Sequence, residues 1–125
     1  MRLSLEDALR SYASLWNTLD PAGFLALLAE DFIYESQAVL EPLMGGDAFA
    51  DYIGKKVAAV KTSGTTVHAE MGSVGTRPCV ILAQGSKDDL VALAFVALEA
   101  GRVKRLDLCM VPPPRTATRT GDYPR

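Results

Sequence analysis

The sequence has few of the side chains that metal and disulfide sites need. It contains one histidine and two cysteines in 125 residues, at spacings that match no metal-binding motif. Cys79 and Cys109 are predicted on strands separated by one further strand, roughly 9 to 10 Å apart. A disulfide tolerates a Cα separation of up to about 7 Å. We therefore expect two free, buried thiols, no metal and no cofactor.

Long apolar runs and an excess of one charge are also missing. No run approaches the roughly 20 residues that cross a bilayer, and the N-terminal MRLSLEDALR becomes charged too early for a signal peptide. The 13 basic against 15 acidic side chains give a formal charge of -2, and the basic ones are scattered apart from Lys55–Lys56 and Lys104–Arg105. Without a basic stripe we expect no nucleic-acid partner, no membrane partner and a cytoplasmic location.

Apolar periodicity is abundant, and in the first half of the chain its period is helical. Ser4 followed by Asp7 is typical of a helix start, and apolar residues then recur at steps of three and four as far as Leu19. Asp20 and Pro21 predict the start of a short second helix. That helix is expected to carry four apolar residues, Phe24, Leu25, Leu27 and Leu28.

A third helix is predicted to be capped near Asp47 and to end near Ser63–Gly64. Its apolar stripe consists of Phe49, Tyr52, Ile53, Val57 and Val60. The rest of the chain reads as strands, because aromatic and β-branched residues alternate with polar ones between turn signals. The predicted strands are Asp31–Gln37, a short return within Ala38–Gly46, Thr65–Val74, Pro78–Ser86, Leu90–Ala97 and Val103–Val111.

The last two strands are expected to form a hairpin around Ala100 and Gly101. Leu90–Ala97 is apolar at both parities, which implies burial on both faces of its sheet. We expect the helices to cover the inner face and a second copy of the protein to cover part of the outer one.

In the return strand, Leu106, Leu108 and Met110 are predicted inward, and Arg105, Asp107 and Cys109 outward. In the strand from Asp31, Phe32, Tyr34 and Ser36 share one face and Ile33, Glu35 and Gln37 the other. In the strand from Thr65, Val67, Ala69 and Met71 are predicted on one side, and Thr66, His68 and Glu70 on a solvated side.

Helices followed by a four-strand meander predict an α+β fold, with the helices on one side of a mainly antiparallel sheet. We expect a single domain over residues 1–111, followed by a Pro-rich tail over 112–125. The tail sequence PPPRTATRTGDYPR indicates an extended segment that either wraps a surface or is mobile.

Three segments in this order resemble the nuclear transport factor 2-like superfamily, in particular its ketosteroid isomerase and SnoaL-like polyketide cyclase branch. They are YASLWNTLDPAGFLALLAEDFIYES, GGDAFADYIGKKV and GRVKRLDLCMV, and the resemblance covers roughly residues 5 to 111. It implies a cystatin-like roll, in which three N-terminal helices and a curved, mainly antiparallel mixed sheet form a cone around an apolar pocket. It also implies a homodimer through the outer sheet face.

The resemblance carries over only part of the isomerase site. In that family an Asp base moves a proton while a Tyr and a protonated Asp bind the oxyanion. The Tyr matches Tyr12, but the base falls on Ser36 and the protonated Asp falls near Leu93–Phe95, where this chain has no acid. Glu35 is the best remaining acid. Partial burial would raise the pKa of its carboxyl group and let it act as a general base.

The predicted pocket is lined by aromatic, hydroxyl and aliphatic side chains, namely Tyr12, Trp16, Tyr34, Ser36, Tyr52, Val67, Leu106, Leu108 and Met110. The tyrosines can equally be core residues whose hydroxyls reach the rim. A one-residue slip in register would turn Glu35 and Asp107 inward together. His68 and Asp107 share an outer parity, but they are expected about three strand spacings apart, roughly 14 Å, too far for a dyad.

Three functions fit these patterns. The first is an isomerase, cyclase or dehydratase acting on an apolar carbonyl-bearing substrate through Tyr12 and Glu35. The second is binding of an apolar ligand without chemistry. The third is a homodimerisation module whose pocket is filled by its own side chains. An inward acid beside a cavity would favour the first, a cavity without an acid the second, and a filled interior the third.

Overall fold

The computed structural model describes residues 2–38 and 41–125. Its helices are α1 (Leu5–Thr18), α2 (Ala22–Leu25), α3 (Gly46–Ser63) and a 3₁₀ turn, η1 (Pro114–Thr116). Its strands are β1 (Leu28–Ser36), β2 (Leu43–Met44), β3 (Val67–Val74), β4 (Arg77–Gln84), β5 (Leu90–Glu99), β6 (Arg102–Cys109) and β7 (Thr118–Arg119). Residues 39 and 40, in the stretch predicted to contain the short return strand, lie outside the described ranges. In those ranges no helix is both long and apolar enough to cross a membrane.

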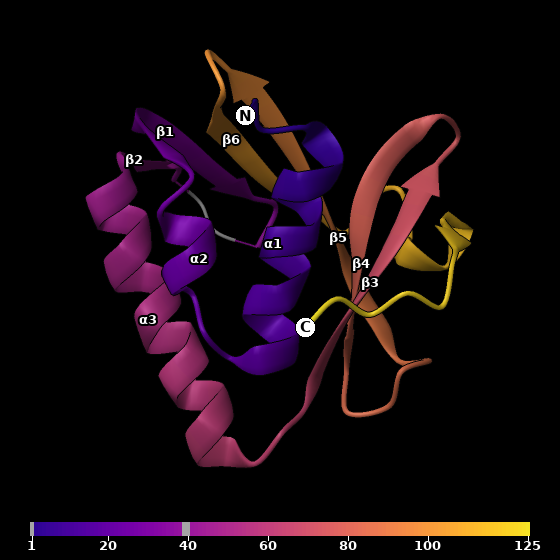
Figure 1. The fold of residues 1–125 in the computed structure, drawn as a ribbon. Helices are drawn as coiled ribbons and strands as arrows, with labels where there is room; N and C mark the ends of the chain where they lie inside the picture. Colours follow the sequence, from indigo (N-terminus) through magenta and orange to yellow (C-terminus); the bar gives the residue numbers. More distant parts are fainter. Residues whose placement is uncertain (1, 39–40) are drawn as a thin grey trace.

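One mixed sheet contains all the described strands, in the order β2-β1-β6-β5-β4-β3-β7. The β1–β6 pair is parallel and the other pairs are antiparallel. Helices α1, α2 and α3 lie against one face of this twisted sheet (Figure 1). The predicted α+β class is therefore confirmed, whereas the enclosing cone stays a prediction.

The inner core forms between α1 and the sheet. The Ser4 hydroxyl accepts a hydrogen bond from the Asp7 N–H at 3.0 Å, which caps α1 as predicted. The centre of the apolar face of α1 is buried and includes Leu9, Tyr12 and Leu15. Because the inward residues of the strands pack against this face, the sheet parity decides which polar side chains can reach the interior.

Two helix boundaries differ from their predictions. The second helix ends at Leu25, because the Leu27 carbonyl accepts a hydrogen bond from the Val103 N–H and so joins the chain to β6. Leu28 is consequently the first residue of β1. The third helix follows Gly45, whose φ of 95° favours glycine, and Asp47 makes no capping hydrogen bond. The Asp47 charge lies in the first turn, where it complements the helix dipole.

Strand β5 is buried on both faces, as its composition predicts. Ala94 and Val96 belong to the inner core, whereas Leu93 and Phe95 belong to an outer apolar cluster. The hairpin to β6 turns through Ala100 and Gly101, which both have positive φ (52° and 75°), the geometry of a two-residue turn that matches strand twist.

The C-terminal segment wraps the sheet edge. Residues of η1 lie on the outer face, where Ala117 packs on the cluster of Cys79, Ile81, Leu93 and Phe95. Strand β7 then pairs with β3, and the Pro124 carbonyl accepts a hydrogen bond from Asn17 Nδ2 of α1 at 2.6 Å. The chain thus covers part of the outer face that we assigned to a second copy.

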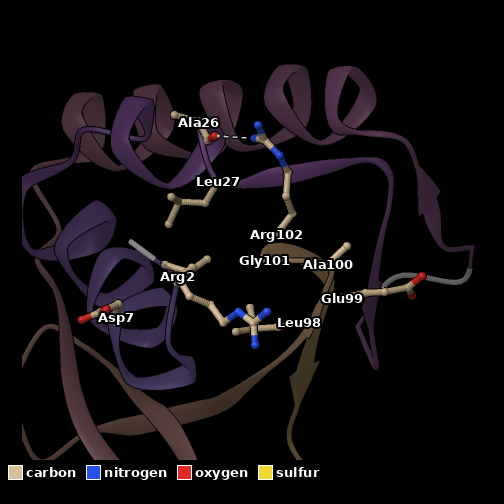
Figure 2. A pocket seen from close by; sticks show the side chains of 10 residues that line it. Arg2, Asp7, Ala26, Leu27, Leu98, Glu99, Ala100, Gly101 and Arg102 are labelled. Carbon is tan, nitrogen blue, oxygen red and sulfur yellow. Dashed lines mark hydrogen bonds between the residues drawn. The ribbon is translucent and has the colours of Figure 1, made fainter.

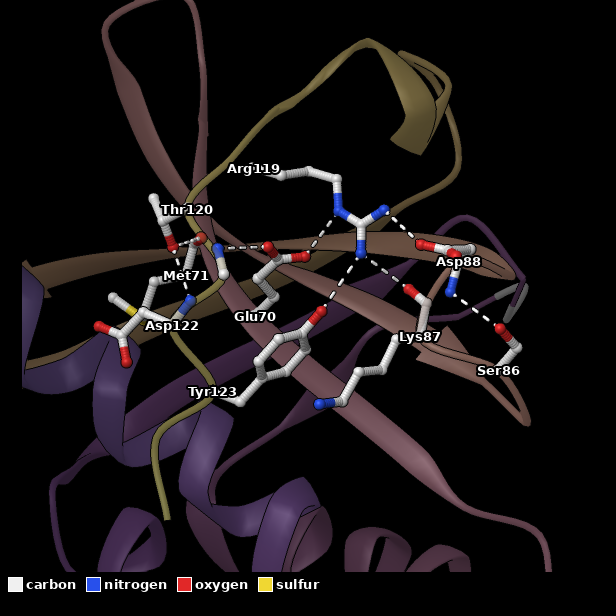
Figure 3. Close-up of polar contacts among 10 residues, drawn as sticks. Glu70, Met71, Ser86, Lys87, Asp88, Arg119, Thr120, Asp122 and Tyr123 are labelled. Carbon is white, nitrogen blue, oxygen red and sulfur yellow. Dashed lines mark hydrogen bonds and ion pairs between the residues drawn. The ribbon is translucent and has the colours of Figure 1, made fainter.

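The solvated face predicted for β3 is wrong at Glu70, which is only 3% exposed. Figure 3 shows why: Arg119 of β7 donates from Nε to Glu70 Oε1 at 2.8 Å, and the Gly121 N–H donates to Oε2 at 2.7 Å. The same guanidinium reaches Asp88 and Tyr123. The tail therefore supplies the partners that let this carboxylate be buried.

Both cysteines are free thiols, but only Cys79 is buried as expected, because Cys109 near the end of β6 is partly exposed. Cys79 is fully buried in the outer apolar cluster. Burial disfavours the thiolate and raises the pKa of Cys79 to about 11.

Candidate ligand pocket

A cavity of about 540 Å³ lies between α1, α3 and the inner face of the sheet. Most of the predicted pocket residues lie around it: Tyr12, Trp16, Tyr34, Ser36, Tyr52, Val67 and Leu108. They come from both helices and from β1, β3 and β6. Their role in binding stays a prediction, but the fold brings them to one place.

Two of the predicted residues do not line this cavity. Leu106 is fully buried in the core beneath it. Met110 lies beyond the end of β6 and is 37% exposed. The Gln37 side chain explains the second case, because its Oε1 accepts hydrogen bonds from the N–H groups of Met110 and Val111 and directs the chain away from the inner face.

Helix α3 contributes lining residues that the sequence analysis did not assign to the pocket. They include Phe49, Ile53, Lys56, Val60 and Ser63. Tyr52, Lys56 and Val60 are spaced by four residues, so they share one side of the helix. That spacing to Tyr52 is the signal that could have identified Lys56.

The polar groups of the cavity include the phenols of Tyr12, Tyr34 and Tyr52. Trp16 Nε1 donates a hydrogen bond to the Tyr12 hydroxyl oxygen at 3.0 Å, which leaves the Tyr12 proton available to a ligand. The rings of Tyr34 and Tyr52 lie next to each other, with centroids 5.4 Å apart. Burial raises the pKa of both Tyr12 and Tyr34 above the ordinary range of a phenol. These groups are therefore neutral hydrogen-bond donors.

The best acid candidate points to the other face of the sheet. Glu35 Oε1 lies 2.8 Å from Arg105 Nη2, and Arg105 also holds Asp107 at 3.0 Å. Glu35 and Asp107 are paired across β1 and β6, and the next pair, Ser36 with Leu108, faces the cavity. The two carboxylates raise the pKa of Arg105, which stays charged.

This register excludes the one-residue slip that would have turned both carboxylates inward. As a result, the described lining of the cavity contains no carboxylate and no imidazole. Ala94, from the segment that matches the protonated Asp of the isomerases, faces inward as an apolar residue. The cavity can donate hydrogen bonds, but its described lining lacks the carboxylate base of the isomerases.

The single histidine does not form a dyad with Asp107. His68 lies on β3, and β4 and β5 separate it from β6. One ring nitrogen, Nε2, lies 2.9 Å from the Gly85 carbonyl oxygen. Within residues 2–38 and 41–125, no group of three or more His, Cys, Asp or Glu side chains could hold a metal ion.

A second and larger hollow, of about 980 Å³, lies beside the hairpin turn at Ala100 and Gly101 (Figure 2). Its polar groups do not converge. Arg102 Nη1 donates to the Ala26 carbonyl oxygen at 3.1 Å, and the carboxylates of Asp7 and Glu99 lie on opposite sides of the hollow. Ligand sites combine an apolar lining with a few convergent polar groups, so the cavity beside Tyr12 is the better candidate.

The comparisons with known proteins bear on the fold. No family model matches the chain, and neither does any curated protein sequence. Among solved structures, a SnoaL-like protein from Burkholderia thailandensis is similar at 16% identity, with 97% of this chain and 100% of that one covered and a TM-score of 0.63. An NTF2-like protein from Cytophaga hutchinsonii is similar at 16% identity, with coverages of 92% and 96% and a TM-score of 0.62.

The chain has the nuclear transport factor 2-like fold. A protein with a ketosteroid isomerase-like fold from Catenulispora acidiphila is also similar, at 12% identity, with coverages of 85% and 86% and a TM-score of 0.57. Two further similar structures carry the words polyketide cyclase in their names. At these identities the likeness establishes the NTF2-like fold, and the chemistry has to be argued from the side chains of the cavity.

Proposed function

We propose that this NTF2-like protein binds an apolar, carbonyl-bearing small molecule in the cavity between α1, α3 and the sheet. The observation that carries the proposal is a cavity of about 540 Å³ lined by aromatic rings and phenols, without a carboxylate in its described lining. A volume of this order is typical of small-molecule sites. It also argues against a dimerisation module whose interior is filled by its own side chains.

Tyr12 is the proposed donor to the ligand oxygen. Its hydroxyl oxygen already accepts from Trp16, so its own proton is directed to another acceptor. Its raised pKa keeps that proton in place. A buried carbonyl oxygen needs a donor, and a neutral phenol supplies one without the cost of burying a charge.

An enzyme of the isomerase, cyclase or dehydratase type is the second candidate. Tyr12 matches the oxyanion donor of the family that the sequence resembles, and this match favours chemistry on a carbonyl group. Glu35 does not serve such an enzyme in this geometry, because it is paired with Arg105 on the outer face. The missing base is the reason that we rank binding above catalysis.

The test compares two probes with the same carbon skeleton, 2-acetylnaphthalene and 2-ethylnaphthalene, of which only the first has a carbonyl oxygen. Tyr12→Phe should weaken binding of the ketone by about 1 kcal/mol, roughly fivefold, and leave the hydrocarbon unaffected. Equilibrium dialysis measures both affinities. Loss of the bond from Trp16 should also reduce the free energy of unfolding by about 1 kcal/mol.

Tyr123→Phe is the matched control, because the Tyr123 hydroxyl accepts from Arg119 on the outer side of β3 and does not line the cavity. It should leave both affinities unchanged. The proposal is refuted if the wild-type protein binds neither probe, or if Tyr12→Phe leaves the ketone affinity unchanged.

We further propose that a second copy of the chain covers the part of the outer sheet face that the C-terminal segment leaves open. Support comes from Ala97, which is exposed on this face of β5, and from the partly buried Cys109, which packs on the buried apolar cluster beneath. The cytoplasmic location stays a prediction.

A further inference from the structure

We propose that Lys56 gives this pocket a preference for amphipathic anions. The apolar part of such a ligand fills the cavity, and its acidic group contacts the Lys56 ammonium. The inference rests on the proposed function, because it concerns the same cavity. Lys56 is the one charged side chain in the described lining, and the remaining polar groups there are neutral.

The position of Lys56 suits a charge at the mouth of the cavity. It lies on α3 one turn after Tyr52, and its Nζ is 5.5 Å from the centroid of the Tyr52 ring. This cation–π contact holds the exposed ammonium beside a ring that itself lines the cavity. The apolar stem of the lysine then covers the ring while its charge meets water.

The charge of Lys56 has no partner in the described structure. Its neighbour Lys55 pairs with Asp51 at 3.1 Å, whereas no carboxylate of residues 2–38 or 41–125 lies within ion-pair distance of Lys56. The nearby Ser63 hydroxyl is occupied, since it donates to the Val60 carbonyl and accepts from the Thr65 N–H. Lys56 is therefore the available donor for an acidic group at this rim.

This arrangement would strengthen the binding of an anionic ligand and weaken the binding of a cationic one. A ligand carboxylate would accept a charge-assisted hydrogen bond from the ammonium. An alcohol of the same length would make the same apolar contacts but would lack the attraction between opposite charges, and an ammonium ligand would be repelled. Because the site is exposed, the preference should be modest and should decrease as salt is added.

The test is a titration followed by the fluorescence of Trp16, the single tryptophan of the chain, which lines the cavity. The probes are decanoate, 1-decanol and decylammonium at low ionic strength. Decanoate should bind about fivefold more tightly than decanol, and decylammonium more weakly than either. Adding salt to 0.5 M should bring the three affinities together.

Lys56→Gln should remove the preference for decanoate and leave the decanol affinity unchanged. Lys55→Gln is the matched control, with the same loss of charge one residue away, and it should retain the preference. Equal affinities of decanoate and decanol for the wild-type protein would overturn the inference. So would an equal loss of preference in the two variants, which would mean that general surface charge is responsible.

The inference and the proposed function fail in distinguishable ways. If 2-acetylnaphthalene binds and decanoate does not, the anion preference alone is wrong. If neither the naphthalene probes nor the three decyl probes bind, the cavity is not a ligand site and both proposals fail.

Discussion

At the scale of single residues, polar side chains are sorted between the two faces of the sheet by parity. Ser36 faces the cavity and the adjacent Glu35 faces Arg105. Because successive side chains on a strand point to opposite faces, these placements could be predicted from the alternation of DFIYESQ and VKRLDLCMV. Lys56 was missed although it lies one helical turn after Tyr52, because this spacing places it beside Tyr52 without indicating a cavity there.

The burial of Glu70 gives a prediction for Arg119. Arg119→Ala should reduce the free energy of unfolding by about 1 to 3 kcal/mol, because it leaves the Glu70 carboxylate buried with fewer partners. The value is below that of a fully buried pair, since the Arg119 side chain is 34% exposed. Urea unfolding at neutral pH measures the change.

Arg115→Ala is the control for the loss of an arginine from the same segment. Arg115 is exposed on η1, and its substitution should change the free energy of unfolding by less than about 0.5 kcal/mol. Equal effects of the two substitutions would show that the Glu70–Arg119 pair does not hold the tail in place.

At the scale of elements, the long helices and strands could be predicted and the short ones could not. The helical period of α1 and the doubly apolar composition of β5 extend over many residues, so tertiary contacts only adjust their ends. Strand β7 is two residues long and carries no periodic signal. Its pairing depends on Glu70 and on the backbone of β3, which are distant in sequence.

The contact between β3 and β7 is close enough to require a glycine. A Cβ added at Gly72 would lie 2.6 Å from the Thr118 carbonyl oxygen and 2.5 Å from Ile81 Cδ1. Gly72→Ala should therefore separate β7 from β3 and cost about 1 to 3 kcal/mol of unfolding free energy. Thermal and urea unfolding measure the cost.

Gly54→Ala provides the opposite case for the same substitution. Gly54 lies within α3, and an added Cβ there would meet no atom within 4 Å. Alanine should stabilise the helix by about 0.5 to 1 kcal/mol. A neutral Gly72→Ala beside a stabilising Gly54→Ala would contradict the close packing of β7.

At the scale of the whole molecule, the two sides of the sheet have different chemistry. The inner side packs against the helices around a cavity whose described lining contains neutral donors and the single charge of Lys56. The outer side carries the charged cluster around Arg105 and an apolar cluster partly covered by the tail. The fold class followed from the order of elements. The covering of the outer face by the tail could not be predicted, because a Pro-rich segment shows no packing pattern in the sequence.

The proposed dimer predicts the behaviour of two adjacent positions on β5. Ala97 is exposed on the outer side, and Val96 is buried in the inner core. Ala97→Asp should give a folded monomer on size-exclusion chromatography with light scattering, because a charge would be buried between two copies. Val96→Asp should instead unfold the chain. A wild-type protein that is monomeric, or an Ala97→Asp variant that remains dimeric, would refute the interface.

The central claim is that small molecules bind on the inner side of the sheet, in the cavity whose described lining contains no carboxylate. The most direct measurement is a two-dimensional NMR titration with 2-acetylnaphthalene, in which the indole N–H of Trp16 gives a unique signal because it is the only tryptophan. Since this N–H donates to Tyr12, we predict that its signal shifts together with those of Tyr34 and Tyr52, while Arg105 and Phe95 stay unchanged. Shifts confined to Arg105, Phe95 and their outer-face neighbours would contradict the claim.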